Sequence, residues 1–212
     1  MEFESSRPRV VLGLLGGIAS GKTHVARTLA TLTPVRIVDA DSLAHEALDQ
    51  CARDGRLAAH MGPEYVTDEG KADRGALAAE VFANPTRLRR LERLVHPMVM
   101  AAIRHAIQNH RRGEGPPVLV LDVPLLIEVG LDRRCDALWF VQVPEALRLE
   151  RAQRLRGLSA EEVARRERAQ SPLRRKRARA DCIIHNDVTD AALREQLRGC
   201  LDSVGVPTTT AG

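Results

Sequence analysis

The sequence predicts an α/β protein in which helices flank a parallel sheet of five strands. Short aliphatic runs alternate with segments in which apolar residues recur at helical spacing. The runs are aliphatic on both faces, which is typical of strands buried in a parallel sheet. The first run leads into a glycine-rich turn that fits G-x-x-x-x-G-K-[ST], and a helical pattern follows it. The expected strands cover residues 10–15, 35–39, 118–123, 137–143 and 182–186.

The glycine-rich turn carries the most specific chemistry of the chain. Its sequence is Gly16-Gly17-Ile18-Ala19-Ser20-Gly21-Lys22-Thr23. Glycines let the backbone curl until N–H groups point at phosphate oxygens, and the N-terminus of the following helix adds its positive dipole. We expect Lys22 to reach the β- and γ-phosphates and the Thr23 hydroxyl to bind Mg²⁺. With its strand and helix in place, the motif predicts a P-loop that binds a nucleoside triphosphate.

Carboxylates follow two of the other expected strands. In a parallel α/β sheet, ligands bind beyond the carboxyl ends of the strands. Asp41 is predicted to take a proton from an attacking hydroxyl or to help hold the metal, and capping a helix that starts at Ser42 is the alternative. Asp39 is assigned a structural role. Asp122 ends the aliphatic run at 118–121 like a Walker B carboxylate and is a candidate Mg²⁺ ligand.

Residues 56–111 interrupt the alternation of strands and helices and are predicted to be mostly helical. A long helix is expected to open at Asn84-Pro85. Pro97 is expected to kink or restart this helix, because proline lacks the N–H of a helical hydrogen bond. An insertion of this length exceeds a simple connection, so we predict that it covers the site and binds the second substrate.

The positive charge of the chain is concentrated in one stretch. Residues 146–179 hold twelve Lys or Arg and four Asp or Glu, a local charge of +8 in a chain of net charge +4. Two helices joined near Gly157 are predicted at residues 147–172, and we interpret them as a lid whose arginines bind the phosphates of ATP. The run Arg174 to Arg179 also fits a nucleic-acid patch, but the apolar strand directly after it favours a place within the fold.

Composition is that of an ordinary globular protein. The 212 residues suit one domain, and an aromatic content of 2% argues against base-stacking platforms for nucleic acids. Four scattered cysteines without a C-x-x-C pair predict free thiols in a reducing compartment, with neither a zinc site nor a disulfide framework. We expect no leader at Met1 to Arg9, no bilayer-spanning segment and a frayed end at 205–212. The prediction is a cytoplasmic protein without a membrane partner.

The order of the motifs resembles that of dephospho-CoA kinases over roughly residues 10–202. The P-loop is the generic part of this resemblance. The specific parts are Pro124-Leu125-Leu126 with Glu128, and the segment from Phe82-Ala83-Asn84-Pro85 to His96-Pro97. Further matching positions are Val38-Asp39-Ala40-Asp41, Asp73-Arg74, Leu77, Arg151, Arg154, Arg166, Gln170, Ala180-Asp181 and Asn186.

The resemblance implies transfer of the γ-phosphate of ATP, with Mg²⁺, to the 3′-hydroxyl of dephospho-coenzyme A, the last step of coenzyme A synthesis. It implies one P-loop NTPase-type kinase domain over residues 1–212, with a nucleotide-binding core at 8–55, 112–146 and 173–205, a helical CoA-binding insertion at 56–111 and a helical lid at 147–172. The expected catalytic residues are Asp41, Lys22, Arg151 and Arg154. The expected nucleotide-binding residues are Gly16, Gly17, Ala19, Ser20, Gly21, Lys22, Thr23, His24 and Asn186. The expected acceptor-binding residues are Asp41, Arg74, Leu77, His96, Glu128 and Arg166, and the expected metal ligands are Thr23 and Asp122.

Two positions of the P-loop depart from the family pattern. The family usually has Gly where Ala19 stands and Thr where His24 stands. Ala19 is compatible with the loop only at a negative φ, whereas His24 still offers its backbone N–H, so we expect ATP binding to survive. Asp122 is not a fixed position of the family, and its role rests on the strand pattern alone.

A nucleoside or nucleotide monophosphate kinase is the alternative enzyme, because it shares the core, the lid and the helical acceptor region. A nucleotide-gated binding protein, or a nucleic-acid binder that uses Arg174 to Arg179, is the alternative from another class. The chain has no Asn-Lys-x-Asp element of a guanine-specific switch. We therefore predict dephospho-CoA as the small-molecule partner, no nucleic-acid partner, and a monomer or weak homo-oligomer.

Overall fold

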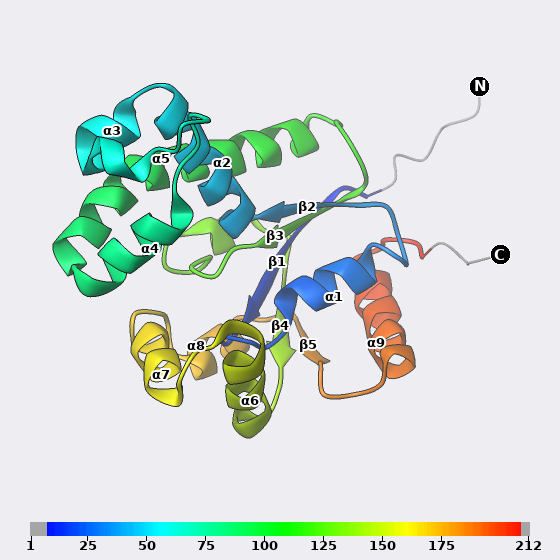
Figure 1. Cartoon of the computed structure of the whole chain (residues 1–212). Coiled ribbons are helices and arrows are strands. Elements are labelled where there is room, and N and C mark those ends of the chain that lie inside the picture. The colour runs from blue at the N-terminus through cyan, green and yellow to red at the C-terminus, as the bar shows by residue number, and fades with distance from the viewer. Residues whose placement is uncertain (1–7, 209–212) are drawn as a thin grey trace. The chain divides into compact units, whose positions relative to one another are not determined.

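The computed structural model describes residues 8–208 (Figure 1). Residues 1–7, where no leader is expected, and residues 209–212, at the expected frayed end, lie outside the described part. The strands are β1 (Val10–Gly16), β2 (Val35–Asp39), β3 (Val118–Asp122), β4 (Ala137–Gln142) and β5 (Cys182–His185). They form one sheet in the order β2-β3-β1-β4-β5, which confirms the predicted five-stranded α/β fold.

Helices connect the strands and make up most of residues 40–111. They are α1 (Lys22–Leu29), α2 (Ala40–Arg53), α3 (Arg56–Met61), α4 (Arg74–Ala83), α5 (Pro85–Arg111), α6 (Glu145–Arg156), α7 (Ala160–Arg168), α8 (Leu173–Ala178) and α9 (Asp190–Ser203). Two 3₁₀ turns are η1 (Pro63–Tyr65) and η2 (Leu131–Arg134). The sequence did not predict helix α8, because its residues stand out only as a run of basic side chains.

Strand β1 lies at the centre of the sheet and is paired in parallel with β3 and β4. All seven of its residues are buried, as the aliphatic run predicts for a strand covered on both faces. Helices α1 and α9 lie side by side against the sheet (Figure 1) and contribute Leu29 and Leu197 to a core that also contains Trp139. This core fixes the carboxyl end of β1, from which the glycine-rich loop emerges.

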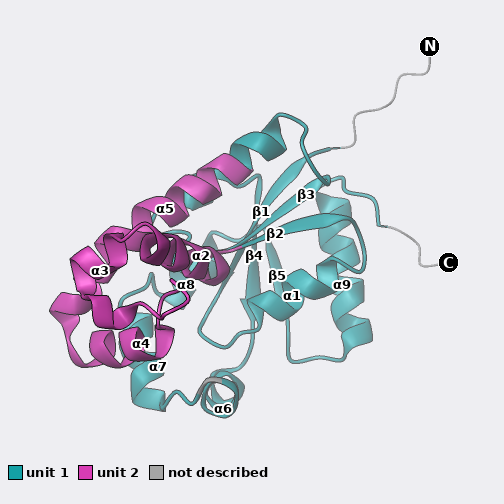
Figure 2. Cartoon of the chain, turned by 45° about the horizontal axis from the view of Figure 1, so that its top comes forward, with its two compact units in different colours: residues 1–38, 107–212 teal, residues 39–106 magenta. Residues whose placement is uncertain are grey.

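The chain divides into two compact units, coloured separately in Figure 2. One contains residues 1–38 and 107–212 and carries the sheet, and the other contains residues 39–106. The second unit is helical and has its own core, in which Cys51, Leu57 and Leu77 are almost fully buried. The amphipathic helices within residues 56–111 therefore pack their apolar faces around the core of the helical unit.

The restart of the helix expected at Pro97 does not occur. Helix α5 runs as one element from Pro85 to Arg111 with Pro97 inside it. Proline in a helix interior removes one hydrogen bond and costs about 3 kcal/mol. Burial of Val95, Val99 and Ile103 on the same helix offsets this cost, since each buried aliphatic side chain contributes about 1.5–3 kcal/mol. Within residues 8–208, no helix combines the length and apolar character needed to cross a membrane.

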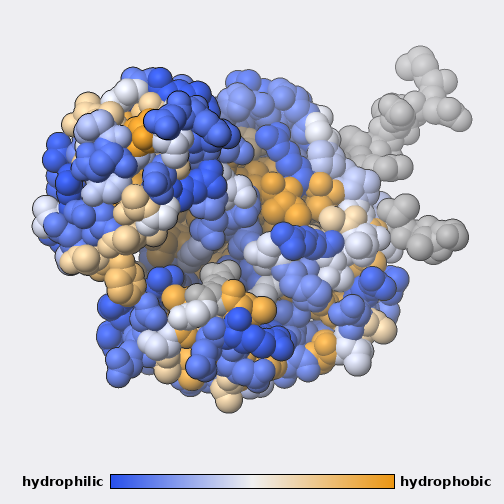
Figure 3. All heavy atoms as spheres, in the orientation of Figure 1, coloured by the Kyte–Doolittle hydropathy of each residue, from blue (hydrophilic) through white to orange (hydrophobic). Residues whose placement is uncertain are grey.

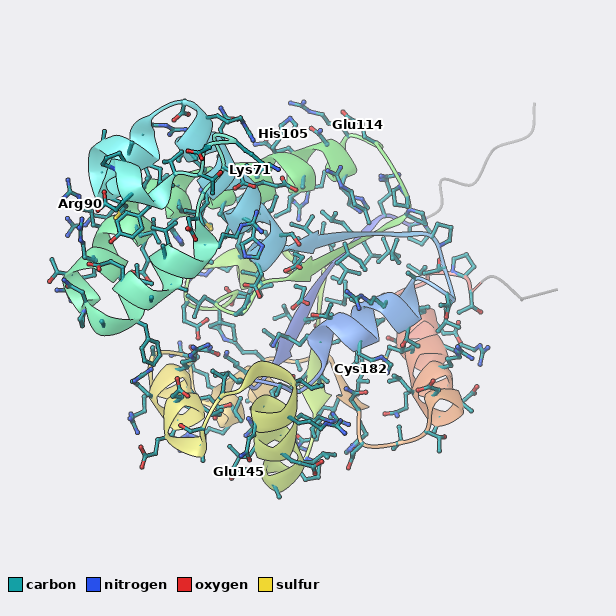
Figure 4. The ribbon with its side chains drawn as sticks, in the orientation of Figure 1. Lys71, Arg90, His105, Glu114, Glu145 and Cys182 are labelled. Atoms are coloured by element: carbon teal, nitrogen blue, oxygen red, sulfur yellow. A yellow bond between two sulfur atoms is a disulfide. The ribbon has the colours of Figure 1, made fainter. Side chains whose placement is uncertain are left out.

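The expectation that all cysteines are free thiols is wrong for one pair. Cys182 on β5, labelled in Figure 4, and Cys200 on α9 form a disulfide with their Cα atoms 6.4 Å apart. Their separation of 18 residues carries no pairing signal, and only the packing of α9 against β5 brings them together. Cys51 and Cys135 are free, and burial raises the pKa of Cys135 to about 12.

We expect His110 to make stability fall with acid. Burial, with Arg9 close by, lowers the pKa of His110 from its ordinary value of 6.5, while Asp136 opposes the shift. Arg9 Nη2 lies 3.3 Å from Nδ1, which must therefore accept the hydrogen bond. The unfolded chain takes up this proton near its ordinary pKa and the folded chain only at lower pH, so stability is lost as pH falls through that window.

The measurement is the urea midpoint at about pH 7.5 and about pH 5.5 in wild type and His110→Gln. The midpoint of the wild type should fall more than that of the variant. His105, exposed on the same helix and labelled in Figure 4, provides the control His105→Gln, which should behave like the wild type. Equal pH dependence in wild type and His110→Gln would contradict the assignment.

Candidate active site

The loop between β1 and α1 closes through a tight turn. The backbone N–H of Ser20 donates to the carbonyl of Gly17 at 3.3 Å. Gly21 has a φ of +85°, and a Cβ at this position would collide with the side-chain amide of Asn186. Glycine is therefore required here for two separate reasons, its left-handed backbone and the close approach of Asn186.

Asn186 and Arg151, both predicted from the sequence, brace this loop from the side of β5. Asn186 follows β5, is 7% exposed, and its Nδ2 donates to the carbonyl of Ser20 at 2.8 Å. Arg151 on α6 donates through Nη2 to the carbonyl of Asn186 at 3.0 Å. These two hydrogen bonds link α6, the end of β5 and the loop, so a displacement of one of these segments would alter its hydrogen bond to the next.

The structure brings Thr23 and Asp122 together. Thr23 Oγ1 donates to Asp122 Oδ2 at 2.7 Å, and Asp122 is 5% exposed at the end of β3. No cluster of three or more His, Cys, Asp or Glu suited to a metal lies in the described part of the chain. Mg²⁺ usually takes one or two protein oxygens together with waters and substrate phosphates. The two oxygens are of the kind that Mg²⁺ prefers.

The loop also fits a phosphate chain. The first N–H groups of α1 lie at the amino end of the helix, at Lys22 and Thr23. Lys22 donates through Nζ to the carbonyl of Gly17 at 3.4 Å, which keeps its ammonium group at the loop. The N-terminus of a helix and a cation together make a ready site for anionic oxygens.

Ala19 adopts the conformation that the sequence analysis held to be incompatible with alanine. Its φ is +57°, in the left-handed region, at the third position of the turn closed by Ser20. This position favours glycine, and a side chain there costs roughly 1–2 kcal/mol. The Ala19 side chain packs against a buried cluster of Ala152, Leu158 and Val163, which offsets part of that cost.

Ala19→Gly should therefore stabilise the protein. Removing the left-handed strain outweighs the added backbone entropy of glycine in the unfolded chain, and we expect a gain of about 0.5–1 kcal/mol in the free energy of unfolding. Urea denaturation measures this change. Ala26→Gly, in the middle of α1 and fully buried, is the control of opposite sign and should lose more than about 1 kcal/mol, since glycine both weakens the helix and removes a buried methyl group from the core. A destabilised Ala19→Gly would show that the packing of the methyl group dominates.

Arg148 and Glu167 connect helices α6 and α7 to the loop. Arg148 is one of the arginines of the predicted lid, whereas no role was predicted for Glu167. Arg148 Nη1 lies 2.6 Å from Glu167 Oε1, and the Arg148 side chain is only 6% exposed. Arg148 also donates to the carbonyl of Ile18 at 3.3 Å, and Glu167 Oε1 accepts from the N–H of Ile18 at 3.2 Å. The pair therefore forms hydrogen bonds with both the backbone N–H and the backbone carbonyl of Ile18.

Glu167→Gln should weaken this connection. A charge-assisted hydrogen bond to a largely buried guanidinium contributes on the order of 1.5–3 kcal/mol, and the amide replaces it with a weaker neutral one. We expect a lower urea midpoint and a raised KM for ATP with a smaller change in kcat. Glu161→Gln, exposed on the same helix, is the control and should leave both values unchanged. An unaltered KM for ATP would restrict Glu167 to a purely structural role.

Lys176 is a second residue missed from the sequence, hidden within the basic run. It is 2% exposed on α8, and its Nζ donates to Gln170 Oε1 at 2.8 Å and to the carbonyl of Pro124 at 3.4 Å. Glu128 lies 3.8 Å from the same ammonium group and accepts a hydrogen bond from the N–H of Ser171. Burial lowers the pKa of Lys176, and Glu128 opposes this shift. The sequence hints at the inward position of Lys176 only through Leu173, an apolar residue three positions earlier on the same face of the helix.

The helical unit carries four of the expected acceptor residues, Asp41, Arg74, Leu77 and His96. Asp39, not Asp41, caps α2, since its Oδ1 accepts from the N–H of Asp41 at 3.0 Å. The capping alternative for Asp41 is therefore wrong. Asp41 is exposed, and its carboxylate has no hydrogen-bond or ion-pair partner among residues 8–208. Arg74 pairs with Asp49 at 2.8 Å.

The remaining predicted residues differ in their exposure. Leu77 is 2% exposed within the core of the helical unit, whereas His96 on α5 is exposed. Arg154 on α6 and Arg166 on α7 are exposed, on helices whose visible surface is mainly hydrophilic in Figure 3. His24 is also exposed, with Nε2 3.9 Å from Asp190 Oδ1.

A loop of this geometry on a five-stranded parallel sheet defines a P-loop kinase. The dephospho-CoA kinase family model matches residues 10–191. A dephospho-CoA kinase from Parasynechococcus marenigrum is 42% identical over 176 residues, which are 82% of this chain and 86% of that protein. The chain therefore belongs to the dephospho-CoA kinase family.

Two solved structures extend the likeness to three dimensions. A protein from Thermus thermophilus has a TM-score of 0.72 and 35% identity, over 92% of this chain and 97% of that one. Dephospho-CoA kinase from Campylobacter jejuni has a TM-score of 0.65 and 25% identity, over 92% of this chain and 97% of that one. The predicted P-loop architecture and the predicted kinase class are confirmed.

Proposed function

We propose that this chain transfers the γ-phosphate of ATP to the 3′-hydroxyl of dephospho-coenzyme A. The observation that carries the proposal is the family match over residues 10–191, because it includes the P-loop, the helical insertion and helices α6 and α7. A generic P-loop protein would match the loop and its flanking elements alone. ATP, dephospho-CoA and their products are then the small molecules that the enzyme handles.

In the proposed reaction, the acceptor oxygen forms a bond to the γ-phosphorus while the bond from that phosphorus to the bridging oxygen of ADP breaks. Phosphoryl transfer of this kind depends mainly on positioning and on charge stabilisation. Lys22, the first N–H groups of α1 and the arginines Arg151 and Arg154 stabilise the phosphate oxygens. Asp41 orients the acceptor hydroxyl and takes its proton, a role that suits an exposed carboxylate without an ion-pair partner.

Thr23 and Asp122 are the residues that would hold Mg²⁺. Their oxygens are 2.7 Å apart, at the start of α1 and the end of β3. When bound with ATP, Mg²⁺ neutralises charge on the β- and γ-phosphates. We assign residues 56–111 to binding of the acceptor and residues 147–172 to a lid. Arg74, His96, Glu128 and Arg166 are assigned to the acceptor. Leu77 supports that region from its core.

A substrate panel tests the proposal directly. The protein is incubated with ATP and dephospho-CoA, adenosine or AMP, and ADP formation is followed by a coupled assay. Phosphorus NMR of the product then locates the new phosphomonoester. ADP formation that depends on dephospho-CoA, with the phosphate on the 3′-oxygen, is the expected result. Phosphorylation of a nucleoside or nucleotide alone would instead support the monophosphate-kinase alternative.

A cytoplasmic location, a monomeric or weakly oligomeric state and the absence of a nucleic-acid partner stay predictions from the sequence. Binding to nucleic acid through Arg174 to Arg179 would fall steeply as salt rises. A mobility-shift experiment at low salt measures it, and we expect no shift. The structure supports this expectation, since Lys176 of that run is buried and Arg179 pairs with Asp132.

A further inference from the structure

The basic run along α8 leaves three arginines, Arg174, Arg175 and Arg177, that the proposed phosphoryl transfer does not use. Helix α8 turns Lys176 inward, and Arg179 pairs with Asp132. Arg174 and Arg177 are three residues apart and therefore share a face of the helix. Both are exposed, and their side chains make no hydrogen bond or ion pair with any other residue in the described part of the chain.

These two arginines border a small cavity at the end of β4. Its volume is about 230 Å³, and its lining includes Gly17, Val143 and Leu173. Arg148 lines the same cavity, so three guanidinium groups surround it. Glu145, labelled in Figure 4, is the single carboxylate among the lining residues. The volume is below the range of about 300–1,000 Å³ that is typical of sites for drug-sized ligands.

The charge around the cavity is not balanced by the protein. Arg148 is compensated by Glu167, which lies 2.6 Å away outside the cavity lining. Arg174 and Arg177 then face a single carboxylate, and like charges on the wall of one small cavity repel each other. A guanidinium group presents a planar fork of N–H donors that matches the oxygens of phosphate. A bound oxyanion would therefore satisfy both arginines at once.

We propose that this cavity is a second anion site that binds a tetrahedral phosphate group, separate from the P-loop. The ligand is inorganic phosphate, or the terminal phosphate of a small phosphomonoester that enters through the open side. Arg174 and Arg177 are its principal contacts. The cavity shares Gly17 with the P-loop, but its principal contacts are assigned to neither ATP nor the acceptor, so the site does not depend on the identity of the acceptor substrate.

The position of the cavity connects its occupancy to the P-loop. Val143 lies in the connection that precedes α6, and Leu173 is the first residue of α8, directly after the connection that follows α7. Gly17 belongs to the loop, and Arg148 donates to the carbonyl of the next residue, Ile18, at 3.3 Å. An anion held here links both ends of the α6–α7 segment to the loop, so we expect bound phosphate to raise the thermal stability of the ADP complex.

Calorimetry on the full chain saturated with ADP tests the proposal, because ADP occupies the P-loop and leaves the second site open. Inorganic phosphate is titrated at constant ionic strength, and one equivalent should bind with a Kd of about 1 mM or tighter. Arg174→Ala/Arg177→Ala should weaken this binding by about tenfold or more while its affinity for ADP stays unchanged. Arg175→Ala, exposed on the same helix and outside the cavity lining, is the control and should bind like the wild type.

A second titration with glycerol phosphate separates the two sources of the ligand. Tighter binding of the ester identifies a phosphorylated metabolite, and tighter binding of inorganic phosphate identifies the free ion. Both results support the site. Absence of phosphate binding to the ADP complex at about 10 mM overturns the proposal. Displacement of the phosphate by a non-hydrolysable ATP analogue also overturns it, since the cavity would then belong to the triphosphate site. Both of these tests use the wild type alone, so they hold even if the double variant fails to fold.

Discussion

Asp41→Asn is expected to lower kcat by about 10²–10⁴-fold, the usual contribution of a positioned general base. Asparagine keeps the size and the hydrogen-bonding reach of the side chain but cannot accept the proton of the acceptor hydroxyl. The KM for ATP should change little, because Asp41 is assigned to the acceptor and not to the nucleotide. Initial rates at saturating ATP and dephospho-CoA give the measurement.

Asp39→Asn is the matched control, since it removes a carboxylate two residues away. Asp39 caps α2, and asparagine is an equally good N-cap, so both stability and kcat should stay close to wild type. An unchanged kcat in Asp41→Asn would remove Asp41 from the catalytic residues.

Local pattern predicted most of the fold, because it reports which segments are buried on which face. The strands β1 and β3 are continuous aliphatic runs, and both proved buried along their whole length. The predicted join of two helices near Gly157 is also present, since a left-handed Gly157 ends α6 and a capping box at Ser159 begins α7. The helix does not restart at Pro97, because a local rule about proline cannot weigh the burial that surrounds it in the folded helix.

The site was predictable only where a motif fixes the backbone. The loop from Gly16 to Thr23 and its neighbour Asn186 belong to recognisable patterns, and the structure brings them together. Glu167 and Lys176 were missed because their roles come from tertiary contacts across 149 and 52 residues of sequence. A charged residue in a charged stretch carries no local signal that it is buried. Ala19 shows the opposite case, in which a local rule excluded a conformation that the surrounding packing supports.

Asp122→Asn is expected to lower kcat/KM for ATP by about 10²–10³-fold, the usual effect of losing one group that stabilises transition-state charge. It should also raise the Mg²⁺ concentration needed for half-maximal activity, because the amide is a poorer ligand for a hard cation than a carboxylate. A purely structural role for this buried residue would lower the urea midpoint and leave the Mg²⁺ requirement unchanged. Titration of activity with Mg²⁺ at fixed ATP distinguishes the two cases.

The contact between Thr23 and Asp122 allows a stricter form of this test. Thr23→Val removes the hydroxyl, and Thr23→Ser keeps it and should retain most activity. If Thr23 and Asp122 act on the same Mg²⁺, the double variant Thr23→Val/Asp122→Asn should be far less impaired than the product of the two single effects. Independent, multiplicative effects would mean that the two oxygens, 2.7 Å apart, serve different functions. The metal assignment would then have to rest on Thr23 alone.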